Sequence, residues 1–368
     1  MRNKTCTYLI IEILRCNFKN ICYFASKLNK NMINLVSDTL TKPTPKMLEY
    51  MMSAEVGDDV FNEDPSVNGL QNRVADMFGK EAALFCPSGT MTNQIAIKIN
   101  TKPLDDVICD IDSHIYQSET GGYAFNSGVA ISLINGINGK ITANQVESVL
   151  KPGFDWQPIS RLVVLENTCN KGGGSFYTID EVKPIFDLCK IKGLKMHLDG
   201  ARLFNALIET GESTQMWGKY FDTISVCMSK GLGAPVGSLL IGNKSIIKEA
   251  RRFRKVMGGG MRQAGYLAAA CDYALDHHIE RLKEDNDRAK IIGDVLKSMP
   301  YVKSLKPVLT NIVIFKLQDD IKDLDFIEKL KDKGILAVPF GGNTIRFVLH
   351  LDVSDKMIEQ ACRLLKEM

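Results

Sequence analysis

The chain has 368 residues, of which 45% are hydrophobic and 24% are charged, and its formal net charge at pH 7 is +3. This composition is typical of a globular protein with one large domain and a smaller one. The near-neutral charge, with no basic stripe, argues against a nucleic-acid partner. No run reaches the roughly 18 to 20 apolar residues that a membrane span needs.

Residues 1–32 differ in composition from the rest of the chain. They carry a single acid, Glu12, against the basic residues Arg2, Lys4, Arg15, Lys19, Lys27 and Lys30. We interpret them as a variable extension ahead of a domain that starts near Met32. The alternative is an organelle-targeting peptide, since such peptides are basic and poor in acids. A mitochondrial location would then be expected.

The ten cysteines of the chain are scattered and show no CxxC spacing. Several lie in apolar runs such as Val107–Cys109, where a free thiol behaves as a small core residue. This pattern favours a reducing compartment, the cytosol, over a disulfide framework, and it predicts no metal-ligand set.

From Ile33 onward, apolar strand-like runs alternate with helical patterns. Gly69–Gly79 reads as a helix, and a second one opens after Ser88. Continuous apolar strands separated by helices predict an α/β fold with a mostly parallel sheet covered on both faces. The predicted strands are 82–85, 107–110, 130–134, 162–166, 195–199, 223–228 and 238–241, with a helix at 179–192 among the connectors.

The C-terminal part of the chain predicts a separate small α+β domain. A long polar helical connector is expected over 276–297, followed by strands at 310–317, 335–339 and 344–351 and a capped helix at 354–368. We therefore divide the chain into a large domain, 33–285, and a small domain, 286–368. Residues 33–60 are expected to pack near the small domain.

Four polar groups follow predicted strands, where ligands bind in open α/β sheets. Ser88, Gly89 and Thr90 open a helix and could bind a phosphate through backbone N–H groups, although a plain N-cap gives the same pattern. His114 follows the strand that ends at Asp110, and its ring could stack on a planar cofactor or move protons. A structural histidine in a loop is the plainer alternative.

Asp199 and Lys230 end neighbouring strand–helix units. A carboxylate at Asp199 could keep a cofactor's ring nitrogen protonated, and it could equally cap the helix that follows. Lys230 lies in a glycine-flanked turn from which its amine could form an imine, although most lysines are solvated surface residues. Together these residues predict a pyridoxal-phosphate (PLP) site. In chain order they would supply a phosphate-binding helix start, a ring that stacks on the cofactor, a carboxylate for its ring nitrogen and a lysine that forms an imine.

Many short segments resemble, in order, those of the threonine aldolases, which are fold-type-I PLP enzymes of the β-eliminating lyase group. The most specific are His197–Ala206, Ser229–Ser238 and Gly258–Gln263, and the resemblance covers Ile33 to the C-terminus. The other matching segments are 37–39, 41–43, 55–60, 63–65, 79–83, 87–90, 112–114 and 166–168.

The resemblance implies a role for each matching residue. Ser88, Gly89 and Thr90 would bind the PLP phosphate, His114 would stack on the ring, Asp199 would pair with its nitrogen, and Lys230 would bond to its aldehyde. Ser37, Arg202 and Arg346 would bind the substrate carboxylate, with Arg202 also next to the cofactor. Lys255 and Arg262 would reach the cofactor site of a neighbouring subunit in a tetramer built from dimers. The simpler interpretation is that Lys255 and Arg262 form a basic surface patch.

Four positions depart from the family pattern. Val36 replaces an arginine, Phe61 a tyrosine and Cys169 a histidine, and Trp156 occupies the approximate place of a histidine near the substrate hydroxyl. None belongs to the expected cofactor contacts, so these differences bear on substrate and stereochemistry instead.

The resemblance implies retro-aldol cleavage of L-threonine, L-allo-threonine and related β-hydroxy-α-amino acids to glycine and an aldehyde, in glycine and threonine metabolism. His114, or a water that it holds, is the expected acceptor of the hydroxyl proton. Fold alone does not distinguish this reaction from β-elimination or transamination. A PLP-binding scaffold without activity is a third alternative, against which the intact Asp199, Lys230, Arg202 and Arg346 argue.

Overall fold

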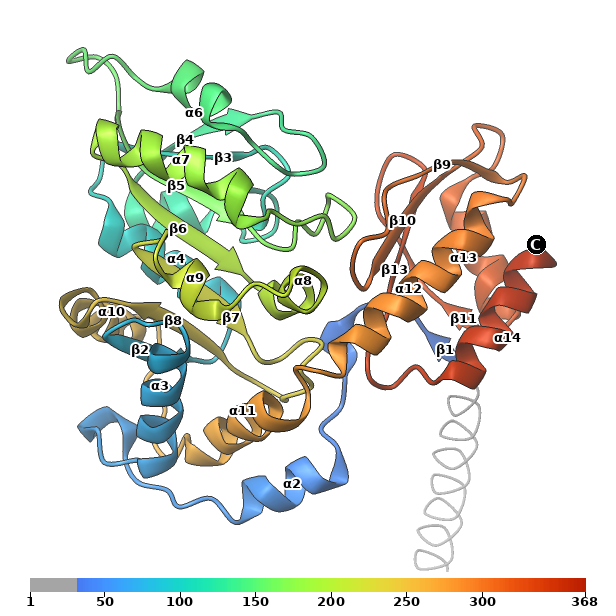
Figure 1. Ribbon diagram of the computed structural model, residues 1–368, viewed down its shortest axis with the longest axis horizontal. Helices are drawn as coiled ribbons and strands as arrows, with labels where there is room; N and C mark the ends of the chain where they lie inside the picture. The colour runs from blue at the N-terminus through green and yellow to red at the C-terminus, as the bar shows by residue number, and fades with distance from the viewer. Residues whose placement is uncertain (1–31) are drawn as a thin grey trace, which may run out of the picture.

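The computed structural model describes residues 32–368, so the extension expected at residues 1–32 lies almost wholly outside the described part. Two lobes are visible, joined by the long helix α12, Leu282–Lys297 (Figure 1). We call them the large lobe, built on a seven-stranded sheet, and the small lobe, built on a four-stranded sheet. None of the helices within residues 32–368 is long and apolar enough to cross a membrane.

The large sheet has the strand order β2-β8-β7-β6-β5-β3-β4. The strands from β7 to β4 are mutually parallel, whereas β8 runs antiparallel to both of its neighbours. The predicted α/β fold with a mostly parallel sheet is therefore confirmed. The strands are β2 Ala82–Cys86, β3 Asp105–Asp110, β4 Ala130–Ile134, β5 Ile159–Glu166, β6 Lys195–Gly200, β7 Thr223–Cys227 and β8 Ser238–Gly242.

Helices cover both faces of this sheet because its strands are apolar on both sides. In β5, Val163 and Leu165 belong to the main core, while Leu162 and Val164 pack into a separate cluster on the other face. Alternation of this kind follows from the two-residue period of a strand. The helices of the large lobe are α2 Pro45–Met52, α3 Pro65–Met77, α4 Gly89–Asn100, α5 His114–Gln117, α6 Ala143–Val149, α7 Ile179–Lys192, α8 Leu203–Thr210, α9 Thr214–Gly218, α10 Lys244–Val256 and α11 Gly265–His277.

The small lobe has its own hydrophobic core around an antiparallel sheet of order β12-β13-β10-β9. The N-terminal strand β1, Ile33–Asn34, pairs with β11, and Ile33 and Leu35 are fully buried in this core. The start of the described chain thus packs with its end. The remaining elements are β9 Val302–Leu305, β10 Ile312–Leu317, α13 Asp323–Asp332, β11 Ile335–Leu336, β12 Val338–Pro339, β13 Thr344–Val348 and α14 Asp355–Lys366.

Two predicted elements are divided in the structure. The connector expected over 276–297 is interrupted after α11, and α12 begins only at Leu282. The strand expected over 335–339 is split, since Ile335–Leu336 pairs with β1 and Val338–Pro339 pairs with β13. An apolar run carries no information about which partner each half will find. The predicted domain boundary at 285 falls inside α12 and stays a prediction.

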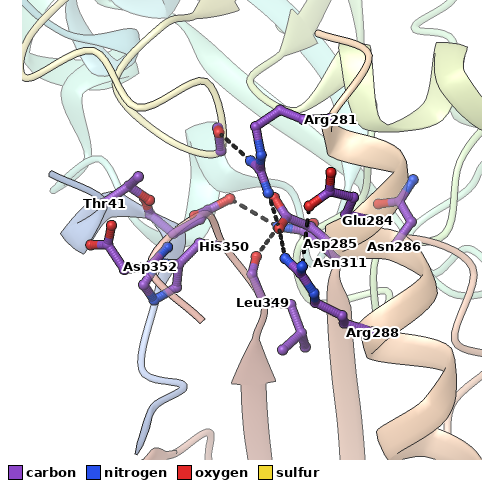
Figure 2. Close-up of polar contacts among 12 residues, drawn as sticks. Thr41, Arg281, Glu284, Asp285, Asn286, Arg288, Asn311, Leu349, His350 and Asp352 are labelled. Carbon is purple, nitrogen blue, oxygen red and sulfur yellow. Dashed lines mark hydrogen bonds and ion pairs between the residues drawn. The ribbon is translucent and has the colours of Figure 1, made fainter. Parts of the chain in front are cut away.

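The first turns of α12 hold a charged cluster where the two lobes meet. Figure 2 shows Arg281, Asp285 and Arg288 along this stretch, next to Asn311 and Leu349 of the small lobe. Asp285 is fully buried and pairs with Arg281, whose Nη1 also lies 3.4 Å from the carbonyl oxygen of Gly231. The turn that holds Lys230 therefore contacts the helix that joins the lobes.

Candidate active site

Asp199 lies near the carboxyl end of β6, buried with only 2% of its surface exposed. Its Oδ2 accepts a hydrogen bond from Asn93 Nδ2 at 2.8 Å, and its Oδ1 accepts one from the Ala201 backbone N–H at 3.2 Å. A carboxylate oxygen can accept two hydrogen bonds, so Asp199 retains acceptor capacity for a further N–H donor. The carboxylate is thus both held in place and able to bind a protonated ring nitrogen.

Glu166 is the neighbour of Asp199 in the sheet, because the two residues are partners in the β5–β6 register. Burial, together with the adjacent charge of Asp199, raises the pKa of Glu166 to about 7. Its oxygens accept hydrogen bonds from the backbone N–H groups of His114 and Asn170, at 2.7 and 2.8 Å. Glu166 therefore fixes the backbone of two site residues at once.

His114 begins α5, and its imidazole is half-buried. Nδ1 lies 2.9 Å from Oε1 of Glu119, a buried carboxylate. Burial alone would lower the pKa of His114, but the hydrogen bond to Glu119 and the negative charges of Asp199, Glu119 and Glu166 raise it above its usual value. An imidazole in this setting is well suited to accept a proton near neutral pH.

Ser88 caps the N-terminus of α4, accepting a hydrogen bond from the Met91 backbone N–H at 3.2 Å. Gly89 lies so close to the end of β7 that an added Cβ would come within 2.5 Å of Cys227 Sγ. The helix start is thus pressed against the strand ends, where its free N–H groups and dipole favour an anion. Thr90 is exposed at the same helix start.

Lys230 follows β7 in a tight turn closed by a hydrogen bond from the Gly233 backbone N–H to the Lys230 carbonyl oxygen, at 2.8 Å. The residue is half-buried, and its charge contributes to lowering the pKa of Asp38. β6 and β7 are adjacent parallel strands, and Asp199 pairs in register with Ser225, ahead of the turn that holds Lys230. That the two side chains meet at one cofactor stays a prediction.

Arg202 is buried and binds Asp38 through two hydrogen bonds, Nε to Oδ2 at 2.7 Å and Nη2 to Oδ1 at 2.6 Å. Burial alone would raise the pKa of Asp38, but Arg202, with help from Lys230 and Asn311, lowers it to about 2. Two of the guanidinium nitrogens are thus occupied by Asp38, and Nη1 remains for another acceptor.

Arg346, on β13 of the small lobe, is the second cation of this part of the site. Its Nη1 donates to Asn170 Oδ1 at 2.9 Å, its Nη2 donates to the Val36 carbonyl oxygen at 3.3 Å, and its guanidinium lies over the Phe340 ring, 4.6 Å from the centroid. Burial and the like charge of Arg202 lower the pKa of Arg346 to about 10. In the described part of the chain, its buried Nε has no hydrogen-bond partner.

Ser37 lies between Val36 and Asp38, which contact the two arginines, whereas Lys255 and Arg262 lie elsewhere. Ser37 is half-buried and caps a short 3-10 helix, Asp38–Leu40, accepting hydrogen bonds from Thr39. Lys255, in the last turn of α10, and Arg262, beyond that helix, are both exposed, and Arg262 pairs with Asp58 at 2.8 Å. Within residues 32–368, no hydrogen bond or ion pair joins either of them to Ser88, Gly89 or Thr90 of the same chain.

The two departures nearest to the expected substrate differ in their surroundings. Cys169 is buried beside Glu166, with Sγ 3.1 Å from the Glu166 carbonyl oxygen. Trp156 is 78% exposed and stacks on Phe154 before the start of β5, whereas Glu166 is at the other end of that strand. A strand rises about 3.3 Å per residue, so the two ends of β5 are roughly 20 Å apart, and Trp156 comes before the end opposite to Glu166. The comparison of Trp156 with the family's histidine stays a prediction.

His114, Glu119 and Asp199 each offer a ligand atom within 4.8 Å of the others. The amide nitrogen of Asn93 donates to both carboxylates, at 2.9 Å to Glu119 and 2.8 Å to Asp199. An N–H donor between the two oxygens takes the position that a cation would need. We interpret the group as a hydrogen-bonded network rather than as a metal centre.

Sequence reasoning missed several residues of the site. Asp38 belongs to a matching segment, but the resemblance implied a role only for the neighbouring Ser37. Asn93 and Glu119 follow Ser88 and His114 by five residues each, within the helix and loop that those residues open. Asn170 and Glu166 flank Cys169. Their only signal was proximity in sequence to residues already chosen.

The architecture is that of the fold-type-I PLP enzymes: a threonine aldolase from Leishmania major aligns with a TM-score of 0.79 at 24% identity, covering 91% of this chain and 99% of that one. The family model for the beta-eliminating lyases matches residues 34–320. The chain belongs to this beta-eliminating lyase family, as its sequence motifs indicated.

Two relatives show how far the similarity extends. A low-specificity L-threonine aldolase 1 of Arabidopsis thaliana is 37% identical over 329 residues, which is 88% of this chain and 92% of that protein. A low specificity L-threonine aldolase of Escherichia coli K12 is 38% identical over 331 residues, 89% of this chain and 97% of that protein.

Proposed function

We propose that this protein is a PLP-dependent aldolase that cleaves L-threonine, L-allo-threonine and other β-hydroxy-α-amino acids to glycine and an aldehyde. The observation that carries the proposal is the position of three groups at the carboxyl ends of parallel strands: Asp199 on β6, Lys230 after the adjacent β7, and His114, which offers a ring nitrogen within 4.8 Å of the Asp199 carboxylate. Arg202 and Arg346 lie close enough for the charge of Arg202 to lower the pKa of Arg346. The names of the curated relatives support the same reaction.

The residues present fit the cofactor. Asp199 has acceptor capacity left for a ring nitrogen, and Lys230 offers an amine one strand away. Ser88, Gly89 and Thr90 form a helix start whose backbone N–H groups suit a phosphate. When bound, PLP supplies a ring that withdraws electrons and so stabilises the negative charge left at Cα after a bond breaks.

The charge of the arginine pair fits an amino-acid substrate. Arg202 and Arg346 carry two positive charges, and Asp38 neutralises one of them. One substrate carboxylate would neutralise the other and could bind Arg202 Nη1, which donates no hydrogen bond within residues 32–368. Two fixed guanidinium groups would also orient the substrate, so that the Cα–Cβ bond is the one weakened by the cofactor.

His114 is the residue of this chain best suited to accept the β-hydroxyl proton, directly or through a water. Its raised pKa and half-buried imidazole fit general base catalysis near neutral pH. Loss of that proton lets the aldehyde leave. Lys230 would hold the cofactor through its amine before the substrate binds and after glycine leaves.

The decisive experiment is product analysis of the purified protein with L-threonine, L-allo-threonine and phenylserine. The proposal expects glycine and an aldehyde in equal amounts. Ammonia and a 2-oxo acid that keeps the carbon skeleton of the substrate would instead support β-elimination, the reaction that names the family. A protein that binds PLP but turns over none of these compounds would contradict both.

We also propose a cytosolic homotetramer, built from dimers that share active sites. The exposed position of Lys255 and Arg262, away from Ser88–Thr90 of their own chain, supports a role at a neighbour's phosphate. The free thiols of the cysteines in residues 32–368 support a reducing compartment. The mass of the protein in solution, and PLP retention by Lys255→Ala, would test the shared site.

A further inference from the structure

A chain of hydrogen bonds runs through the core behind Asp199. It links Thr223 on β7, His197 on β6, Asn93 on α4 and the buried carboxylate of Glu119. His114 is bonded to the far end of this chain through Glu119. Glu119 is the carboxylate of this chain, and an ionised carboxylate can only accept hydrogen bonds. The groups bonded to Glu119 must therefore donate, and the direction of the other bonds follows from theirs.

Asn93 provides the first assignment. Its amide group contacts Glu119 Oε1 and Asp199 Oδ2 on one side and His197 Nε2 on the other, at 2.9, 2.8 and 3.1 Å. Two carboxylates require donors, so the NH₂ group faces them and Oδ1 faces His197. A flipped amide would point its oxygen at two anions.

His197 follows from Asn93. Burial lowers the pKa of His197 to about 4, so the ring is neutral at pH 7 and carries one proton. That proton is on Nε2, because Asn93 Oδ1 needs a donor. Nδ1 then accepts from Thr223 Oγ1 at 2.9 Å, and Thr223 Oγ1 in turn accepts from Asn100 Nδ2 at 3.0 Å. The Thr223 backbone carbonyl oxygen also lies 3.1 Å from Nδ1, so Nδ1 faces one acceptor beside the donor Thr223 Oγ1.

Glu119 is enclosed by donors and is only 4% exposed. Oε1 accepts from Asn93, and Oε2 accepts from Gln94 Nε2 at 2.6 Å. The remaining contact of Oε1 is His114 Nδ1 at 2.9 Å. Since Glu119 presents an acceptor there, the proton of a neutral His114 must be on Nδ1.

We propose that Glu119 is a positioning residue that holds His114 in the Nδ1–H form, which leaves Nε2 as the ring nitrogen able to accept a proton. Carboxylate–imidazole pairs act in this way in the hydrolytic and metal sites of other proteins, where the carboxylate fixes the tautomer and raises the basicity of the ring. Through Asn93, the same network holds Asp199. The inference deepens the proposed function and rests on it only for the role of Nε2 in the reaction.

Nuclear magnetic resonance of the ring nitrogens tests the assignment without any turnover. The chain has only five histidines, His114, His197, His277, His278 and His350, so substitution of each one can assign its signals. In the full-length protein, with and without PLP, we expect neutral His114 to carry its proton on Nδ1 and His197 to carry its proton on Nε2. A His114 proton on Nε2 would overturn the proposal, even if no variant folds.

The variant Glu119→Gln removes the negative charge and keeps the shape. The charged groups facing His114 are Glu119, Asp199 on β6 and Glu166 on β5, so two of the three remain. We expect the pKa of His114 to fall by about one pH unit or more, because a neutral partner no longer favours the imidazolium. The acid limb of the pH profile of kcat/KM should move to lower pH by the same amount.

The matched control is Glu181→Gln. Glu181 is an exposed residue in the first turn of α7 and pairs with Lys140. This variant should change neither the His114 signals nor the pH profile. An unchanged His114 pKa in Glu119→Gln would reject the positioning role. If the signals shift as expected but the wild-type protein forms no glycine and aldehyde, the proposed function fails while the Glu119–His114 pairing stands.

Discussion

The cofactor side and the substrate side of the site differ in how completely their polar groups are paired. Behind Asp199, the side chains of Asn93, Glu119, His197 and Thr223 form a continuous buried network of hydrogen bonds. At the arginine pair, Arg346 Nε and Asn311 Oδ1 are buried without hydrogen-bond partners within residues 32–368, and Asp38 pairs with Arg202 alone. Unpaired buried groups are costly and mark places that a ligand can complete.

This difference follows the division between the lobes. The cofactor side is built from neighbouring strands and helices of the large sheet, whose register fixes each side chain. The substrate side combines Arg202 of the large lobe with Arg346 of the small lobe, and the two lobes meet at α12 (Figures 1 and 2). We call the cofactor side the platform and the two arginines of the substrate side the clamp. Because the platform belongs to one lobe and the clamp spans two, we expect substitutions in one to leave the other unchanged. The following substitutions test this expectation.

Lys230→Ala should have the largest effect, because it removes the amine that we propose bonds to the cofactor and leaves the rest of the platform in place. We expect loss of the visible absorbance of the lysine-bound cofactor together with loss of glycine formation. Absorbance spectra and product assays measure both. The exposed Lys297→Ala should behave as wild type. If Lys230→Ala kept both signals, the platform would have another covalent residue.

Asp38→Ala should lower the free energy of unfolding by about 3 to 5 kcal/mol, since it leaves the buried Arg202 without its partner. Urea unfolding measures this, with the exposed Asp319→Ala as control. The pKa of Asp38 is lowered from 3.8 to about 2 on folding, so its contribution is present above pH 4 and is lost as pH falls from 4 towards 2. The variant should lack that part of the acid dependence.

Arg346→Ala should chiefly weaken substrate binding while PLP remains bound. A hydrogen bond to a charged group contributes about 1.5 to 3 kcal/mol, so KM should rise by about 10- to 100-fold. Steady-state kinetics and the cofactor spectrum report the two sides of the site separately. Arg363→Ala, an exposed arginine of α14, is the control. Loss of PLP from Arg346→Ala would show that the two sides are not independent.

Phe340→Leu should have the smallest effect. The aromatic face below Arg346 is replaced by an aliphatic group of similar bulk, which removes a cation–π contact worth about 0.5 to 1 kcal/mol. KM should rise by only about two- to fivefold, with kcat and the cofactor spectrum unchanged. A large fall in kcat would mean that Phe340 acts on more than the position of Arg346.

The sequence by itself determined the α/β class, the family and the residues that follow the strands. Alternating apolar runs fix strands, and Asp199 and Lys230 are expected to be close once each is placed at the end of a neighbouring strand. Short motifs around them identified the family because residues near a cofactor are grouped along the chain.

The tertiary structure alone decided which groups pair across long separations. Asp38 meets Arg202, Asn170 meets Arg346, and Glu119 meets both His114 and Asn93, and no periodicity or local motif encodes such contacts. The split of residues 335–339 between two sheets has the same origin. A linear pattern specifies local structure and burial, whereas the partner of a buried polar group depends on how the strands and lobes assemble.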